Sequence, residues 1–260
     1  MARRIAALAL GCAALLAMAA HAQQGPAATK GLDLAQELQR LGEAASALEH
    51  ALPNFTCQES VVSREMNGTK VKQSTKFVAT LRAQRAADGS LSESFAITEL
   101  NGEPFSTGHF HLPVFVSGGF DQAMRYFTPQ KQVCYRYALS PGRIDFETRG
   151  DAPGPPLCKE KDLRGFALLD PEGNVTHLER RVAPVAALAD REANFAAVDF
   201  APATLNGRTY QLSRHLYAEM PMRGRPTTFS ADYNGCKLFT ATVTISPAPP
   251  DGETPDSLPH

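Results

Sequence analysis

The sequence lacks features that would place it in several large classes of protein. No run beyond residue 22 is apolar enough to cross a bilayer, so we expect no transmembrane segment in the mature chain. There is also no basic surplus: removing Arg3 and Arg4 with the first 22 residues lowers the 26 basic residues to 24, against 27 acidic ones. A net charge of −3 is unlike that of a nucleic-acid binder, so no nucleic-acid partner is expected.

Local signatures of catalysis are missing as well. The sequence contains no Gly-x-Ser-x-Gly, His-Glu-x-x-His, phosphate loop, dinucleotide fingerprint or Ser-x-x-Lys. Four carboxylates fall on expected strands, but acid–base work needs two of them at a defined separation. They are Glu93, Glu99, Asp145 and Glu147. We interpret the chain as non-catalytic and without a cofactor, with a hydrolase as the minor alternative.

Residues 1–22 have the three parts of a secretory signal peptide. Arg3 and Arg4 give a positive start, an uncharged apolar run follows, and Ala20-His21-Ala22 forms a small-x-small cleavage site. We expect cleavage near Ala22 and a periplasmic or secreted protein of 238 residues, since 22 of the 260 are removed. The alternatives are an uncleaved membrane anchor and lipid attachment at Cys12.

Four cysteines remain after this cleavage, which is the even number typical of disulfides in an exported protein. The absence of a Cys-x-x-Cys pair disfavours a metal site. Three pairings are open. We prefer Cys134–Cys158, which closes a proline-rich loop, together with Cys57–Cys236, which joins the first strand to a late one.

The residue pattern predicts one helix followed by many strands. Asp33 is a candidate N-cap, and an apolar stripe from Leu34 to Leu52 recurs at steps of three and four, so the helix should end before Pro53. The period then changes to two, which indicates strands. Expected strands lie over 55–66, 77–83, 91–97, 133–139, 143–148, 165–169, 175–182, 210–220 and 238–245, with turns at Asn67-Gly68, Asp88-Gly89, Asn101-Gly102 and Asp170–Asn174.

These elements predict a single α+β domain over residues 32–246. We expect a long antiparallel sheet, curled into a half-barrel or open barrel, packed with the N-terminal amphipathic helix. Residues 23–31 would be a flexible lead and residues 247–260 a disordered tail, while residues 183–194 form a helical turn or linker.

Residues 107–129 are the most aromatic part of the chain, and a short helix is expected near 120–127. Their rings either plug one end of the core or line the mouth of a pocket for an apolar ligand. On the second interpretation the ligand-binding residues are Phe110, Phe115, Phe120, Tyr126 and Phe127.

Two further groups of polar residues have competing interpretations. His109 and His111 share a strand face and could bind a metal ion together. A metal site would need a third ligand, such as Asp121 or His215. We interpret the two histidines as surface or pocket residues and expect no metal. Several arginines on expected strands either pair with glutamates across the sheet or meet an anionic head group at a barrel mouth. They are Arg64, Arg82, Arg136, Arg143 and Arg214.

Three segments carry a resemblance to known proteins: Leu52–Gln58, Gly165–Asp170 and Phe229–Phe239. They look like parts of a family of uncharacterised secreted bacterial proteins. The order of helix, meander and hairpin is also similar to the periplasmic lipoprotein-carrier and outer-membrane lipoprotein-sorting superfamily. That resemblance implies a half-barrel whose hydrophobic concavity holds acyl chains or contacts a lipidated or membrane-protein partner.

Two hypotheses of function follow. In the first, the protein binds a lipid or another amphiphile in the curled sheet, with residues 107–129 as gate or lining. In the second, it is a cell-envelope interaction module whose own side chains fill the concavity.

Overall fold

The computed structural model describes residues 33–105, 119–182, 195–222 and 225–239. The chain divides into two units, Met1–Gly31 and Leu32–His260, and every described residue belongs to the second. The helices of that unit are α1 (Leu34–Ala51), the single 3-10 turn η1 (Arg125–Phe127) and α2 (Pro129–Gln132). Its strands are β1 (Phe55–Asn67), β2 (Lys70–Arg85), β3 (Leu91–Leu100), β4 (Glu103–Pro104), β5 (Tyr135–Ser140), β6 (Arg143–Thr148), β7 (Leu163–Leu169), β8 (Val175–Val182), β9 (Phe195–Leu205), β10 (Arg208–Met222) and β11 (Arg225–Leu238).

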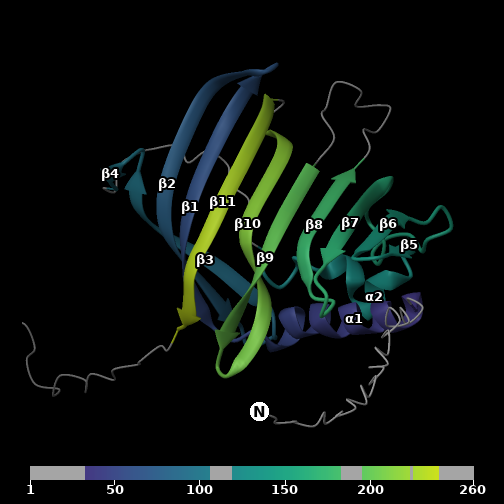
Figure 1. Cartoon of the computed structure of the whole chain (residues 1–260). Helices are drawn as coiled ribbons and strands as arrows, with labels where there is room; N and C mark the ends of the chain where they lie inside the picture. The colour runs from purple at the N-terminus through teal and green to yellow at the C-terminus, as the bar shows by residue number, and fades with distance from the viewer. Residues whose placement is uncertain (1–32, 106–118, 183–194, 223–224, 240–260) are drawn as a thin grey trace, which may run out of the picture. The chain divides into compact units, whose positions relative to one another are not determined.

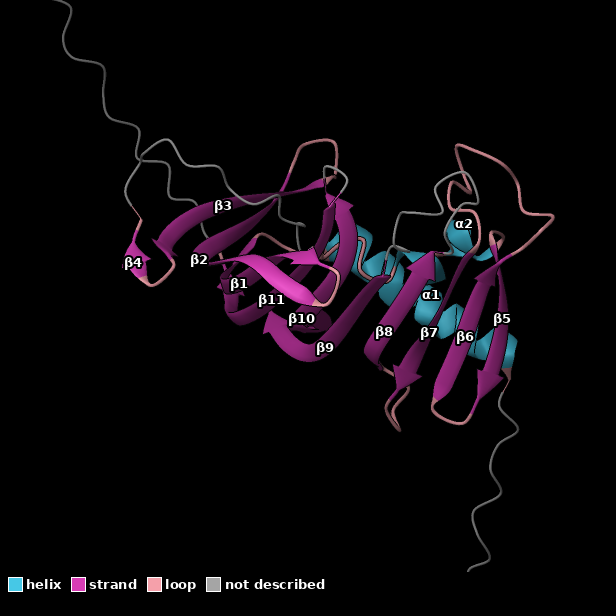
Figure 2. Cartoon of the chain, turned by 90° about the horizontal axis from the view of Figure 1, so that it is seen from above, coloured by secondary structure: helices cyan, strands magenta, loops and turns pink. Residues whose placement is uncertain are grey.

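All the described strands form one antiparallel sheet, in the order β4-β3-β2-β1-β11-β10-β9-β8-β7-β6-β5. The sheet is curled and does not close, because β4 and β5 stay at opposite edges (Figure 2). The predicted α+β half-barrel with an N-terminal helix is therefore confirmed. Since β1 pairs with β11, the first and last described strands form a seam in the middle of the sheet, and the Cys57–Cys236 disulfide crosses it.

The helix α1 begins and ends where the sequence predicts. The Asp33 carboxylate accepts a hydrogen bond of 2.9 Å from the Ala35 amide, and Pro53 follows the last turn. The buried stripe consists of Leu41, Gly42, Ala45 and Leu48.

Side chains from distant strands hold the C-terminal end of α1. The Arg85 guanidinium, at the end of β2, donates to the carbonyl groups of Glu49 and Leu52 at 2.5 and 3.0 Å. The Tyr210 hydroxyl, on β10, donates to the Ala51 carbonyl at 2.8 Å. These donors satisfy carbonyl groups that a helix end otherwise leaves without partners, and they tie α1 across the curl of the sheet.

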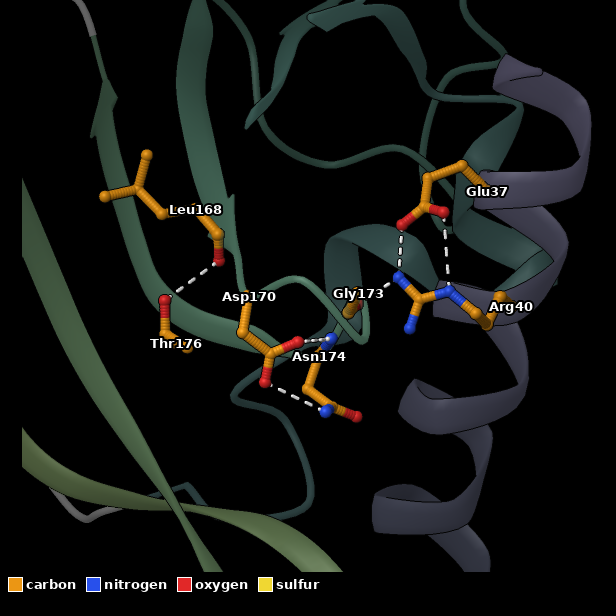
Figure 3. A network of polar contacts seen from close by, with 7 residues as sticks. All are labelled: Glu37, Arg40, Leu168, Asp170, Gly173, Asn174 and Thr176. Carbon is orange, nitrogen blue, oxygen red and sulfur yellow. Dashed lines mark hydrogen bonds and ion pairs between the residues drawn. The ribbon is translucent and has the colours of Figure 1, made fainter. Parts of the chain in front are cut away.

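The N-terminal half of α1 is held by the turn between β7 and β8 (Figure 3). The Asp170 carboxylate accepts hydrogen bonds from the Asn174 amide at 2.7 Å and from its side chain at 3.0 Å. The turn that these two hydrogen bonds stabilise directs the Gly173 carbonyl toward α1. There the carbonyl accepts a hydrogen bond from the Arg40 guanidinium, and Arg40 also forms an ion pair with Glu37. Gly173 has φ +84°, and a Cβ atom there would lie 2.3 Å from Arg40. The turn therefore requires glycine.

Two features of the sequence prediction differ from the structure, and a third lies mostly outside the described residues. The short helix expected near 120–127 is instead the turn η1 followed by α2, because Thr128 precedes Pro129 and is extended at ψ 143°. The sequence pattern gives no bounds for β9 and β11, which form over 195–205 and 225–238. Most of the strand expected over 238–245 lies outside the described residues, as do 183–194 and 247–260.

Candidate ligand-binding site

One face of the sheet carries a continuous apolar row. Following the sheet order β2-β1-β11-β10-β9-β8-β7-β6-β5, each strand contributes one apolar residue that is paired directly with the apolar residue of the neighbouring strand. The row consists of Phe77, Val61, Ala231, Leu216, Val198, Leu178, Ala167, Ile144 and Leu139. All but the half-buried Leu139 are buried, so this face forms the spine of the core.

The aromatic residues predicted to bind a ligand separate into two groups. Phe120 is 1% exposed and makes edge-to-face contacts with Phe55 and Tyr233, at centroid distances of 5.2 and 5.0 Å. Tyr126 and Phe127 are also buried and belong to a different cluster, around Phe146, Tyr135 and Tyr137 on β5 and β6. Phe110 and Phe115 lie outside the described residues.

Phe120 is fixed in place by Glu93 on β3. The Glu93 carboxylate accepts hydrogen bonds from the backbone amides of Gly119 and Phe120, at 3.2 and 2.9 Å. Gly119 has a positive φ of 52°, which allows both amides to point at one carboxylate. Glu93, which the sequence offered as an acid–base candidate, thus positions a ring of the core.

The sheet opens between β10 and β11. These strands are paired only from Met222 opposite Arg225 to His215 opposite Asp232; beyond that point β10 continues along β9, and β11 continues along β1 (Figure 1). A cavity of about 300 Å³ lies where they part, and we call it the β10/β11 cleft. It is lined by Ala201, Pro202, Ala203 and Thr204 of β9, Leu212, Ser213 and Arg214 of β10, and Tyr233, Asn234, Gly235 and Cys236 of β11.

Irregular pairing on both sides causes this opening. On β10 the register with β9 shifts between Ser213 and His215, and along β1 the register with β11 shifts between Thr56 and Gln58. A bulge adds a residue to one strand and increases its local twist, so neighbouring strands diverge. The Cys57–Cys236 disulfide lies at the second shift and borders the cleft.

Two residues that line the cleft, Ser213 and Tyr233, are buried without an aligned hydrogen-bond partner, and so is Glu59, the β1 neighbour of Tyr233. The exposed fractions are 0% for Glu59, 3% for Ser213 and 3% for Tyr233. Among the described residues, neither Glu59 oxygen, nor the Ser213 hydroxyl, nor the Tyr233 hydroxyl has an aligned partner. Folded proteins rarely bury polar atoms in this way unless a water, an ion or a ligand completes them. Glu59 lies opposite Tyr233 across the β1–β11 pairing, so the two groups are neighbours.

The environment of Glu59 disfavours its charge. Burial, with a smaller contribution from the negative charge of Glu93, raises the pKa of the Glu59 carboxyl to about 7. The Tyr233 hydroxyl acts in the opposite direction and lowers this pKa, although the two groups do not align as a hydrogen bond. Burial also raises the pKa of Tyr233, with the charges of Glu59 and Glu93 adding to the effect, so its hydroxyl stays protonated.

The arginines named from the sequence have different surroundings. Arg136 on β5 pairs with Glu147 across the sheet on β6 at 3.4 Å, as the first interpretation expects. Arg143 instead pairs with Asp145 of its own strand, at 2.6 Å. Arg214 is exposed, lines the β10/β11 cleft, and has no ion pair within the described ranges. It is therefore the charged group at the rim of the cleft.

A second cavity is larger but lacks such groups. A groove of about 720 Å³ runs along one side of α1, beside α2 and Arg208. The Gln132 side chain, which lines it, donates to the carbonyl groups of Leu38 and Phe127, both at 2.9 Å. No buried unpartnered polar atom of the described chain lines this groove, so the β10/β11 cleft is the stronger candidate.

Metal and membrane features were sought in the same residues. Within the described ranges no three His, Cys, Asp or Glu side chains are grouped to hold a metal ion. His109 and His111 lie outside these ranges, and His215 instead contacts Asp232 at 2.8 Å. None of the described helices is long and apolar enough to cross a bilayer.

The sequence interpretation missed Glu59, Ser213 and Tyr233. A signal for Glu59 was present, since it interrupts the inward-facing positions Phe55, Cys57 and Val61 with a charged residue. Nothing comparable marks Ser213, because the irregular pairing at Ser213–His215 breaks the alternation that assigns residues to a face.

The described chain is an open antiparallel half-barrel packed with a helix, and it carries the cleft between two of its strands. No protein-family model matches the sequence, and the search of curated proteins finds no match. Among solved structures, the fold is similar to the crystal structure of a LolA superfamily protein from Nitrosomonas europaea. That match has 9% sequence identity and a TM-score of 0.36, and covers 79% of this chain and 94% of the other.

Proposed function

We propose that this protein is a non-catalytic binding protein that holds an amphiphilic small molecule in the β10/β11 cleft. The observation that carries this proposal is that Ser213 and Tyr233 line the cleft with buried hydroxyl groups that have no aligned partner, next to the equally buried Glu59. Burying a polar atom without a hydrogen-bond partner costs free energy, and hydrogen bonds to a bound polar group would offset that cost. An interaction module whose own side chains fill the concavity would give these buried polar groups no such hydrogen bonds.

The walls of the cleft suit the apolar part of such a ligand. Ala201, Ala203 and the buried Leu212 supply apolar surface, and Phe120 packs on the ring of Tyr233 behind it. A volume of about 300 Å³ is near the lower end of ligand pockets, which suits one short chain or ring system.

The proposed setting is an oxidising compartment. The structure contains the disulfides Cys57–Cys236 and Cys134–Cys158, which are the pairs preferred from the sequence. Disulfides persist in periplasmic and extracellular proteins and are rare in the cytosol. Together with the expected signal peptide, they support a periplasmic or secreted protein.

Native mass spectrometry of protein exported with its own signal peptide tests this function. The expected result is extra mass that disappears on denaturation. Ala201→Leu should abolish that mass by filling the cleft, whereas Ala138→Leu, an equal change at an exposed position of β5, should leave it. A bare mass for the wild type would favour the alternative, an envelope interaction module with a filled core. Equal retention of the ligand by both variants would contradict the cleft as the site.

A further inference from the structure

We infer that the polar end of the bound amphiphile is a hydrogen-bond donor, a hydroxyl or a protonated amine, and that it is received by Glu59, Ser213 and Tyr233. This inference rests on the proposed function and adds the chemical class of the ligand. It follows from which groups lie beside the cleft and which do not.

The buried groups beside the cleft are rich in acceptor sites. A protonated amine placed beside Glu59 would favour the ionised form of this carboxyl, which only accepts hydrogen bonds, and neither Glu59 oxygen has an aligned partner. The hydroxyl groups of Ser213 and Tyr233 each accept as well as donate. A ligand N–H or O–H donor would therefore pair with Glu59, and the two hydroxyl groups would complete its remaining bonds.

No positively charged group is among those that act on Glu59. The charged and titratable groups that act on Glu59 are Glu93, from β3, and Tyr233, from β11; no Lys, Arg or His is among them. Glu93 is already committed to the amides of Gly119 and Phe120. A carboxylate or phosphate placed beside Glu59 would meet the negative charge of Glu93, and that of Glu59 when it is ionised, with no cation to offset them, which is unfavourable in a buried region.

Arg214 does not reverse this selectivity. Its side chain is exposed at the rim, where an ion pair with an anionic ligand is screened by water and contributes little. An anionic amphiphile would have to bind with its charge at the rim and leave Glu59, Ser213 and Tyr233 unsatisfied. A donor-headed amphiphile avoids that cost.

Titration calorimetry with three matched probes tests the inference: octylamine, octanol and octanoate, added near neutral pH to the exported protein after its copurified ligand has been removed. Octylamine and octanol should bind at least about tenfold more tightly than octanoate, because only octanoate would place a negative charge beside Glu59 and Glu93. Glu59→Gln should lower the octylamine affinity by about tenfold and the octanol affinity by less. Glu99→Gln, the matched control at an exposed position of β3 away from the cleft, should change neither.

The outcomes separate this inference from the proposed function. Octanoate binding as tightly as octylamine, or an unchanged octylamine affinity in a folded Glu59→Gln variant, would overturn the donor assignment while leaving amphiphile binding intact. The comparison of probes on the wild type needs no variant, and Ser213→Ala gives a second test if Glu59→Gln fails to fold. No saturable binding of any probe, together with a bare native mass, would overturn both.

Discussion

The buried Glu59 carboxyl should make the stability of the ligand-free protein fall as pH rises, and Glu59→Gln should remove that dependence. The pKa of Glu59 in the folded protein is about 7, against the ordinary value of 4.5. The folded state therefore holds this proton more tightly than the unfolded state. Protonation favours folding: the stabilisation is complete below pH 4.5 and is lost as pH rises toward 7.

The size of the effect follows from the shift. A difference of one pKa unit corresponds to about 1.4 kcal/mol, so the full change is about 3 kcal/mol, of which about 2 to 3 kcal/mol should fall between roughly pH 5 and pH 8. Glutamine keeps the shape of the side chain and cannot ionise. Relative to Glu59→Gln, the wild type should therefore lose this amount of unfolding free energy over that interval.

Urea unfolding at the two pH values, with both disulfides intact, measures this difference. Glu99→Gln on β3 is the matched control, because Glu99 is exposed, and it should follow the wild type. An identical pH slope in the wild type and in Glu59→Gln would refute the claim that Glu59 is buried without a partner.

Other parts of the structure give further predictions. Gly173→Ala should lower the unfolding free energy by about 1 to 3 kcal/mol in urea titrations, because φ is +84° and the new methyl group would meet Arg40; an unchanged value would contradict the turn geometry. Reduction of both disulfides should lower the melting temperature markedly, since by loop entropy each bond contributes roughly 3 to 5 kcal/mol, and an equal melting temperature in strong reductant would argue against them. Phe120→Ala should cost about 3 to 5 kcal/mol in stability because the ring is 1% exposed, and should also weaken octylamine binding through its contact with Tyr233; a loss of stability alone would make Phe120 purely a core residue.

Local patterns in the sequence predicted much of the fold. The Asp33 cap and Pro53 bound α1, and alternating residues with Asn-Gly and Asp-Gly turns indicate the first three strands. The structure forms these elements because the same local chemistry governs them: a side chain that caps an amide, a proline that cannot continue a helix, and glycines that accept positive φ. Glycines 68, 89 and 102 all have positive φ, as those turns require.

The candidate site could not be predicted in the same way. The cleft depends on where β10 leaves β11, which is set by two register shifts between residues far apart in the chain. Composition and periodicity carry no information about such a shift, and a shift of one residue exchanges the faces of a strand. The aromatic residues were chosen because of their number. Tyr126 and Phe127 pack in the core around β5 and β6, whereas Phe120 contacts Tyr233, the neighbour of Glu59.

A crystal structure of the protein purified directly from its export compartment tests the central claim most directly. The account predicts elongated density in the β10/β11 cleft, with a donor atom at roughly 2.7–3.2 Å from Glu59 and from the hydroxyl groups of Ser213 and Tyr233. Ordered water alone bridging these three groups, or side chains of the protein filling the cleft, would contradict it.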